Sequence, residues 1–308
     1  VSMNKEIILK VDDLVVAFHM YQKGFRKGNL EVIHALSLDI RKGEILAVVG
    51  SSGSGKSLLA GAVLNLLPGN ARVQGSITYK GEPLDAGKCK RYLGTEIAFI
   101  PQSVDYLDPL MRVEKQVIGV RGTPKRQKEV FRRYQLSDEA GKMYPCQLSG
   151  GMARRVLISS AVMEHPDLII ADEPTPGLNV EMAMETLNHF RELADSGTSV
   201  LMITHDIDLA FHVADRIAVF YAGTIVETAP TADFLAGKDA LRHPYSRAFI
   251  DALPQNGFMP LPGSQPYAGN LPEGCLFADR CECCDEACKG EIAMRTVRNG
   301  KVRCVHAT

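Results

Sequence analysis

The sequence predicts an α/β protein built around a phosphate-binding loop. A short, mostly apolar run from Glu44 to Val49 leads directly into the glycine-rich stretch GSSGSGKS at 50–57, and a helix-forming apolar segment follows at 58–66. Strand-like and helix-like patterns then alternate as far as Asp215. This order of strand, glycine loop and helix, followed by further alternation, is typical of a sheet covered by helices.

Composition and charge narrow the class of protein. The 308-residue chain is 45% hydrophobic and 23% charged, as in soluble globular proteins, and its formal net charge is −1. This near-neutral balance argues against nucleic acid as a partner. The apolar runs are far shorter than the roughly 18 to 20 residues of a membrane span, and no secretory signal is seen. We therefore expect a cytosolic protein.

The first domain is predicted at residues 5–252. Alternating apolar and polar residues from Ile7 to Phe18 predict a strand, and the polar, glycine-containing stretch from Tyr21 to Asn29 predicts the turn of an antiparallel hairpin. The segment from Arg112 to Met143 is rich in charged and helix-forming residues. It predicts an α-helical subdomain, inserted at about 103–165, beside the antiparallel β subdomain.

The glycine-rich stretch carries the strongest chemical signal. Its spacing, G-x-x-x-x-G-K-S, lets successive backbone N–H groups and the start of the next helix cradle phosphates. Lys56 supplies a positive charge to the phosphates, and Ser57 supplies a hydroxyl ligand for Mg²⁺. We therefore expect this loop to bind a nucleoside triphosphate.

A second element is an apolar strand that ends in two adjacent carboxylates. The strand begins at Leu168, and the carboxylates belong to Asp172 and Glu173. Ligands of α/β sheets lie at the carboxyl ends of the strands, so Asp172 is placed to reach Mg²⁺ and Glu173 to polarise an attacking water.

A third motif lies between these two and indicates a family. The sequence LSGGM at Leu148–Met152 resembles the LSGGQ signature of the ATPase subunits of ATP-binding cassette (ABC) transporters. Other motifs stand in the family's order: Gln102 resembles its Q-loop glutamine, His205 its switch histidine and Phe18 its adenine-stacking aromatic residue. The resemblance implies the P-loop NTPase fold of the ABC nucleotide-binding domain.

The resemblance also implies a set of roles. Glu173, His205 and Gln102 are expected to be catalytic, with Mg²⁺ held through Ser57, Gln102 and Asp172. Two cassettes are expected to close face to face, so that each signature contacts the γ-phosphate of the opposite site. The nucleotide-binding residues are expected to be Phe18, Gly50, Ser51, Gly53, Ser54, Gly55, Lys56, Ser57 and Leu58. The signature residues are Leu148, Ser149, Gly150, Gly151 and Met152.

One position departs from the family's pattern. After Glu173 the family usually has Pro-Thr-x-x-Leu-Asp, whereas this chain has Asn179 in the last place. The amide keeps the hydrogen-bonding shape of a carboxylate but not its charge. This leaves open whether the two ATP sites of a dimer are equal.

The remaining residues, 253–308, are predicted to form a proline-rich linker and a cysteine-rich extension. The segment His243–Ala248, the linker and the pattern GCLFADRC at 274–281 resemble the oligopeptide, dipeptide and nickel importer branch of the family. The tail has no periodic apolar face, so we expect it to have little core of its own. The linker prolines are Pro254, Pro260, Pro262, Pro266 and Pro272.

The cysteines of the tail predict a metal centre. Cys275, Cys281, Cys288 and Cys304 have five, six and fifteen residues between successive members. Four thiolates suit a [4Fe–4S] cluster, which the family also favours, or a tetrahedral Zn²⁺; metal-free thiols or a disulfide stay open. Such a centre is expected to be structural, because it would fold and hold the tail.

The resemblance as a whole implies a transport function. We expect an ATP-hydrolysing subunit that powers import of peptides or a related small solute, such as nickel, an opine or a metallophore. Its expected partners are a second ABC ATPase, two transmembrane permease subunits and, through them, an extracytoplasmic solute-binding protein. Its expected place is the cytoplasmic face of the membrane. The segment Tyr106–Val113 either contacts the permease or packs the helical insert. The alternative is a soluble ABC ATPase in DNA repair, translation or metal-cluster assembly.

Overall fold

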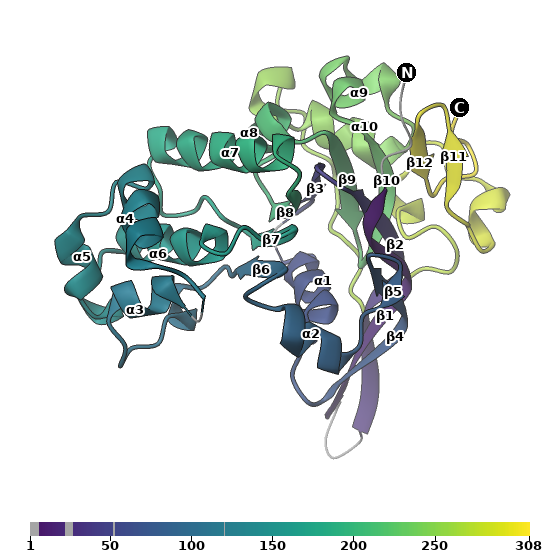
Figure 1. The fold of residues 1–308 in the computed structure, drawn as a ribbon. Helices are drawn as coiled ribbons and strands as arrows, with labels where there is room; N and C mark the ends of the chain where they lie inside the picture. Colours follow the sequence, from purple (N-terminus) through teal and green to yellow (C-terminus); the bar gives the residue numbers. More distant parts are fainter. Residues whose placement is uncertain (1–5, 22–26, 52, 120) are drawn as a thin grey trace. The chain divides into compact units, whose positions relative to one another are not determined.

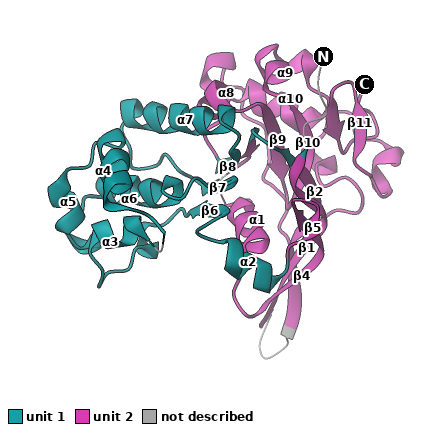
Figure 2. Cartoon of the chain, viewed as in Figure 1, with its two compact units in different colours: residues 1–6, 40–45, 85–204 teal, residues 7–39, 46–84, 205–308 magenta. Residues whose placement is uncertain are grey.

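The structure is a computed structural model that describes residues 6–21, 27–51, 53–119 and 121–308. The chain divides into two compact units (Figure 2). Unit 1 contains Val1–Glu6, Ile40–Ile45 and Asp85–Thr204. Unit 2 contains Ile7–Asp39, Leu46–Leu84 and His205–Thr308.

An antiparallel sheet in unit 2 is built from the N-terminal strands. Its order is β2-β1-β4-β5, and β1 runs antiparallel to β4 with Leu9 opposite Tyr79 and Phe18 opposite Ala71. The strand predicted at 7–18 is thus confirmed, and the turn predicted to follow it falls partly outside the described residues. The strands are β1 (Ile7–Tyr21), β2 (Lys27–Arg41), β4 (Ala71–Tyr79) and β5 (Glu82–Pro83).

A second group of strands in unit 2 leads to the phosphate loop. β3 (Ile45–Val49) is buried along its whole length and runs parallel to β9 (Arg216–Tyr221), as expected of an apolar strand covered on both faces. β10 (Thr224–Pro230) pairs antiparallel with β9. The helices of this unit are α1 (Lys56–Val63), α8 (Ile207–Val213), α9 (Thr231–Leu235) and α10 (Pro244–Asp251).

Unit 1 holds three parallel strands in the order β8-β7-β6. β7 (Leu168–Asp172) lies between the other two, β6 (Ile97–Ile100) and β8 (Ser199–Thr204), and all of its residues are buried. Its last residue, Asp172, lies opposite Ile203 of β8. The helices α2 (Ala86–Tyr92) and α7 (Val180–Asp195) also belong to this unit.

The segment predicted to be an inserted helical region contains helices and no strand among its described residues (Figure 1). Polar residues start three of these helices: Thr123, Ser137 and Ser149 each accept a hydrogen bond from a backbone N–H in the first turn. The helices are α3 (Val113–Ile118), α4 (Pro124–Arg133), α5 (Asp138–Lys142) and α6 (Gly150–Val162).

The C-terminal residues end in a hairpin that the sequence analysis did not anticipate. β11 (Arg295–Val297) pairs with β12 (Gly300–Val302), and β12 pairs in turn with the edge of β10. Only short 3₁₀ turns, such as η5 (Ala278–Arg280) and η6 (Glu286–Lys289), separate α10 from this hairpin. None of the helices in the described part of the chain has the length and apolar character needed to cross a bilayer.

Candidate functional site

Among its described residues, 50–51 and 53–57, the glycine loop has backbone angles and close contacts that favour glycine. Gly53 and Gly55 take positive φ angles of 74° and 101°, which disfavour residues with a Cβ atom. Gly50 is required for space, because a Cβ atom there would lie 2.5 Å from the carbonyl oxygen of Phe220. Buried Lys56 folds back over the loop, and its Nζ donates to the carbonyl oxygens of Gly50 and Ser51, each at 2.8 Å.

The two carboxylates at the end of β7 are buried in unit 1. Glu173 has a positive φ angle of 49°, an uncommon conformation for a residue with a side chain. Its N–H donates to the carbonyl oxygen of Ile203 at 2.8 Å, and Thr204 donates its hydroxyl to Oε2 at 3.5 Å. The end of β8 therefore holds the backbone of Glu173 and makes a long contact with its side chain.

Arg154 is a residue to which the sequence analysis gave no role. It lies on α6 with only 5% of its surface exposed, and its guanidinium donates to the carbonyl oxygens of Pro101 and Gln102. Burial lowers the pKa of Arg154, and the carboxylates of Asp172 and Glu173 oppose that shift. The helix that starts at the signature is thereby bonded directly to the backbone of Gln102.

The signature starts α6 and leaves its polar end at the surface. Ser149 is the N-cap, accepting from the N–H of Met152 at 3.3 Å, and both Ser149 and Gly150 are exposed. A Cβ atom on Gly151 would lie 3.1 Å from the carbonyl oxygen of Gly177. The loop that contains the unusual Asn179 thus lies against the signature.

Asn179 has a local structural role. It is the N-cap of α7, and its Oδ1 accepts from the N–H of Met182 at 2.8 Å. Asparagine and aspartate cap helices about equally well, so the exchange leaves the helix start intact while removing a charge.

The other predicted site residues lie on exposed or half-buried positions. His205 directly follows β8 and is exposed, and Gln102 directly follows Pro101 and is also exposed. Phe18 is half-buried on β1. In the segment proposed to contact a permease, Leu110 is 87% exposed, so its side chain does not pack the helical insert in this unit.

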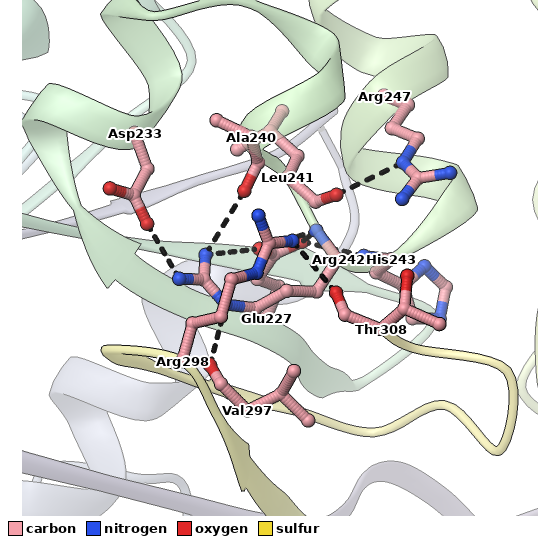
Figure 3. A network of polar contacts seen from close by, with 10 residues as sticks. All are labelled: Glu227, Asp233, Ala240, Leu241, Arg242, His243, Arg247, Val297, Arg298 and Thr308. Carbon is pink, nitrogen blue, oxygen red and sulfur yellow. Dashed lines mark hydrogen bonds and ion pairs between the residues drawn. The ribbon is translucent and has the colours of Figure 1, made fainter.

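A buried ion-pair network joins the cassette to the tail within unit 2 (Figure 3). Arg242 and Glu227 pair at 3.3 Å, with their side chains only 1% and 0% exposed, and Arg242 also pairs with Asp233 at 2.6 Å. Its Nε donates to the carbonyl oxygen of Val297 in the tail hairpin at 2.8 Å. Glu227 further accepts from the N–H of His243 at 2.8 Å. The tail is therefore anchored by charge as well as by strand pairing.

In the cysteine-rich tail, the backbone at Gly274 and Cys275 lies close to the backbone at Cys288. The N–H of Cys275 donates to the carbonyl oxygen of Cys288 at 2.9 Å, and a Cβ atom on Gly274 would lie only 2.2 Å from that same oxygen. Cys288 and Cys304 are buried, Cys275 and Cys281 are half-buried, and none of the eight cysteines, all of which are described, forms a disulfide bond. Burial raises the pKa of the Cys281 thiol to about 11, and the nearby thiols of Cys283, Cys275 and Cys304 add to the shift.

The side chains that come within metal-binding range differ in part from those predicted. Among the described residues, Asp285, Cys288 and His306 form the group whose ligand atoms lie within 4.8 Å of one another. His306 Nε2 lies 3.1 Å from Asp285 Oδ1, and Cys288 Sγ lies 3.8 Å from the same oxygen. Of these three residues only Cys288 was among the predicted ligands.

Comparison with known proteins decides the family. The family model for ABC transporters matches residues 33–176, and the model for the C-terminal region of oligopeptide/dipeptide transporters matches residues 226–288. The chain is 33% identical over 309 residues to the probable D,D-dipeptide transport ATP-binding protein DdpD of Escherichia coli, covering 93% of each chain. The chain belongs to the ABC transporter family, as an ATPase of the oligopeptide/dipeptide importer type.

Other ABC proteins agree with this assignment. The oligopeptide transport ATP-binding protein OppD of Salmonella typhimurium is 33% identical over 319 residues, covering 96% of this chain and 92% of that protein. The solved ATP-binding cassette MJ0796, bound to ADP and Pi, matches with a TM-score of 0.64 and 24% identity, covering 73% of this chain and 99% of the other. The mixed α/β fold predicted from the sequence is thereby confirmed. The chain is an ATP-hydrolysing subunit of a transporter, and the non-transport alternative is not favoured.

Proposed function

We propose that this ABC ATPase drives the import of peptides. The relatives support this cargo, because DdpD is named for transport of D,D-dipeptides and OppD for transport of oligopeptides. Nickel, opines and metallophores, which the sequence left open, have no such support.

The observation that carries the catalytic proposal is the placement of Glu173. It is buried at the carboxyl end of β7, in an uncommon backbone conformation that the end of β8 holds in place. A carboxylate fixed in this way is suited to orient an attacking water and accept its proton as the bond to the γ-phosphate breaks. His205, at the start of the loop after β8, is the second catalytic residue of the proposal.

The phosphate loop supplies the binding half of the proposed site. Lys56 now bonds two loop carbonyl oxygens, and with ATP bound its ammonium would turn to the phosphates. Mg²⁺ would be held by Ser57, Gln102 and Asp172, and it would neutralise the charge of the β- and γ-phosphates. The buried hydroxyl of Ser54 has no hydrogen-bond partner among the described residues, which fits a loop that completes its bonds on a ligand.

The proposed assembly follows from the exposed signature. Ser149 and Gly150 present a helix start to solvent, where a second cassette could bring its nucleotide. Two such ATPases would act with two permease subunits, contacted through exposed residues such as Leu110, and with a solute-binding protein across the membrane. The subunit would accordingly sit at the cytoplasmic face of the membrane.

Glu173→Gln tests the catalytic proposal. The amide keeps the size of the side chain but cannot accept the proton, so ATP hydrolysis should fall by about 10²- to 10⁴-fold while ATP binding persists. The variant should also accumulate as an ATP-bound dimer, measured by size-exclusion chromatography with light scattering. Glu181→Gln, an exposed carboxylate on α7, is the matched control and should hydrolyse ATP normally. Undiminished turnover in Glu173→Gln would refute the assignment.

The tail is proposed to hold a structural [4Fe–4S] cluster on Cys275, Cys281, Cys288 and Cys304. The low exposure of these cysteines supports this proposal: burial raises the pKa of the thiols of Cys275, Cys281 and Cys304, neighbouring thiols add to the shift, and a bound metal would keep such thiols deprotonated. The rival is Zn²⁺ on the group of Asp285, Cys288 and His306.

Metal analysis of the anaerobically purified full chain separates the two. A cluster predicts about four irons per chain and charge-transfer absorbance, both lost in Cys275→Ser and retained in Cys283→Ser, which changes an exposed cysteine outside the set. If the chain instead contains zinc and no iron, and the zinc is retained in Cys275→Ser but lost in His306→Ala, the cluster proposal is wrong and the zinc site is supported.

A further inference from the structure

The proline-rich linker reaches the phosphate loop. A pocket of about 460 Å³ in unit 2 is lined by the loop, by β2, by the turn between β9 and β10, and by the linker from Gln265 to Leu271. The loop contributes Ser51, Gly53 and Ser54, and β2 contributes Leu30 and Val32. The linker, more than 200 residues after the loop in the sequence, thus forms one wall of the pocket that the loop also lines.

A direct bond joins the linker to the loop. Ser51 Oγ donates to Gln265 Oε1 at 3.2 Å, and the carbonyl oxygen of the same serine accepts from Lys56 Nζ at 2.8 Å. Gln265 therefore contacts the residue that also holds the phosphate-binding lysine. Its side chain carries an amide donor as well as the oxygen that Ser51 uses, so a rotation of the amide would offer an N–H to a bound anion.

The linker is held in this place by its own contacts. Arg280 donates to the carbonyl oxygens of Leu261 at 3.3 Å and Pro262 at 2.9 Å, and to the hydroxyl of Tyr221 at 3.3 Å. Tyr221 ends β9, immediately before the turn that lines the pocket. A second turn, closed by the N–H of Asn270 on the carbonyl oxygen of Tyr267 at 2.8 Å, shapes the far end of the linker.

We propose that the linker Gln265–Leu271 is a wall of the ATP pocket and that Gln265 is a positioning residue for the phosphate loop. The chemistry of the lining fits a nucleoside triphosphate: hydroxyls and backbone N–H groups at the loop suit the phosphates, and Val32, Pro266 and Leu271 suit an apolar face of the nucleoside. The proposal rests on the assignment of the loop to ATP. It extends the nucleotide site beyond the cassette itself, into the region that carries the cysteines.

A charge at Gln265 tests the proposal on the full chain. Gln265→Glu keeps the acceptor for Ser51 but puts a carboxylate beside the phosphates, so binding of Mg-ATP at low salt should weaken by about tenfold or more. Binding of AMP should weaken less than binding of ATP, and the loss of ATP affinity should become smaller as the salt concentration rises. A merely structural role of Gln265 would show neither the phosphate dependence nor the salt dependence. Asn299→Asp adds the same charge at the exposed tip of the β11–β12 hairpin and should leave ATP affinity within about twofold of wild type.

Hydrogen exchange gives a second readout that requires no variant. Mg-ADP, which lacks the γ-phosphate that joins two cassettes, should slow amide exchange in peptides covering 263–271 and leave the β11–β12 hairpin unchanged. Unchanged exchange in the linker, or a Gln265→Glu chain that binds ATP like wild type, would overturn the proposal. If the wild-type chain binds no nucleotide in the same titration, the assignment of the loop fails instead.

Discussion

In the phosphate-loop region, β3 is buried along its whole length and the turn that follows is shaped by glycines, whereas the C-terminal tail is held largely by arginine side chains bonded to backbone oxygens. Arg280 binds the linker, Arg242 binds the hairpin, and Arg295 donates to the carbonyl oxygen of Cys304 at 2.9 Å. The apolar cluster of the tail is small, with Val302, Cys304 and Ala307 at its centre.

The difference shows two ways of stabilising parts of one compact unit. Burial of apolar strands gives the loop a stability that depends on shape and volume. The buried pair of Arg242 and Glu227 gives the tail a stability that depends on both partners being present, because removing one leaves an uncompensated charge. Single substitutions should therefore affect the two regions by different mechanisms.

Arg242→Ala should have the largest effect on stability. It leaves Glu227 buried without its cation and removes the bond to Val297, so the free energy of unfolding should fall by about 3–5 kcal/mol. Denaturant unfolding of the full chain measures this change. The matched control is Arg298→Ala, an exposed arginine that donates to the carbonyl oxygen of Thr308 and should cost less than about 0.5 kcal/mol. Equal effects of the two variants would show that the buried network does not anchor the tail.

Gly50→Ala should have an intermediate effect, through shape rather than charge. The new methyl group would lie 2.5 Å from the carbonyl oxygen of Phe220, so the loop must shift, at about 1–3 kcal/mol, and ATP affinity should drop sharply. Gly290→Ala is the matched change in the tail, where a Cβ atom meets nothing within 4 Å. It should bind ATP normally in an equilibrium titration. Normal ATP binding by Gly50→Ala would contradict the crowding inferred at the loop.

A buried histidine in unit 1 should give the smallest effect, and it should depend on pH. Burial, with Arg133 nearby, lowers the pKa of His189 to about 4, and the neutral ring pairs with the hydroxyl of Tyr134. As pH falls from about 6.5 to about 4, the unfolded chain takes up this proton first, so the folded state loses stability.

Replacing His189 by Gln should therefore flatten part of the decline in unfolding free energy between about pH 7 and about pH 5. Denaturant unfolding at the two pH values measures it, with the exposed His212→Gln as control. An identical decline in wild type and His189→Gln would show that this histidine does not contribute.

The same comparison explains what could be predicted from the sequence. The strand before the loop, the loop itself and the strand that ends at Asp172 were readable because apolar runs and glycine spacings act locally. The roles of Arg154, Arg242 and Arg280 could not be predicted. Each arginine bonds to an oxygen atom at least 15 residues away in the sequence, and only the fold brings these groups together. The β11–β12 hairpin was missed for the same reason: its short strands are stabilised by the edge of β10 rather than by a pattern of their own.

Purification from native membranes shows whether this ABC ATPase powers a peptide importer. The tagged chain would be isolated in detergent and without oxygen, and mass spectrometry would identify the proteins and ligands that accompany it. We expect the chain to be recovered with two polytopic permease subunits, a second ATPase and a solute-binding protein that carries peptide. Recovery with only soluble partners, such as ribosomal or DNA-repair proteins, would contradict it.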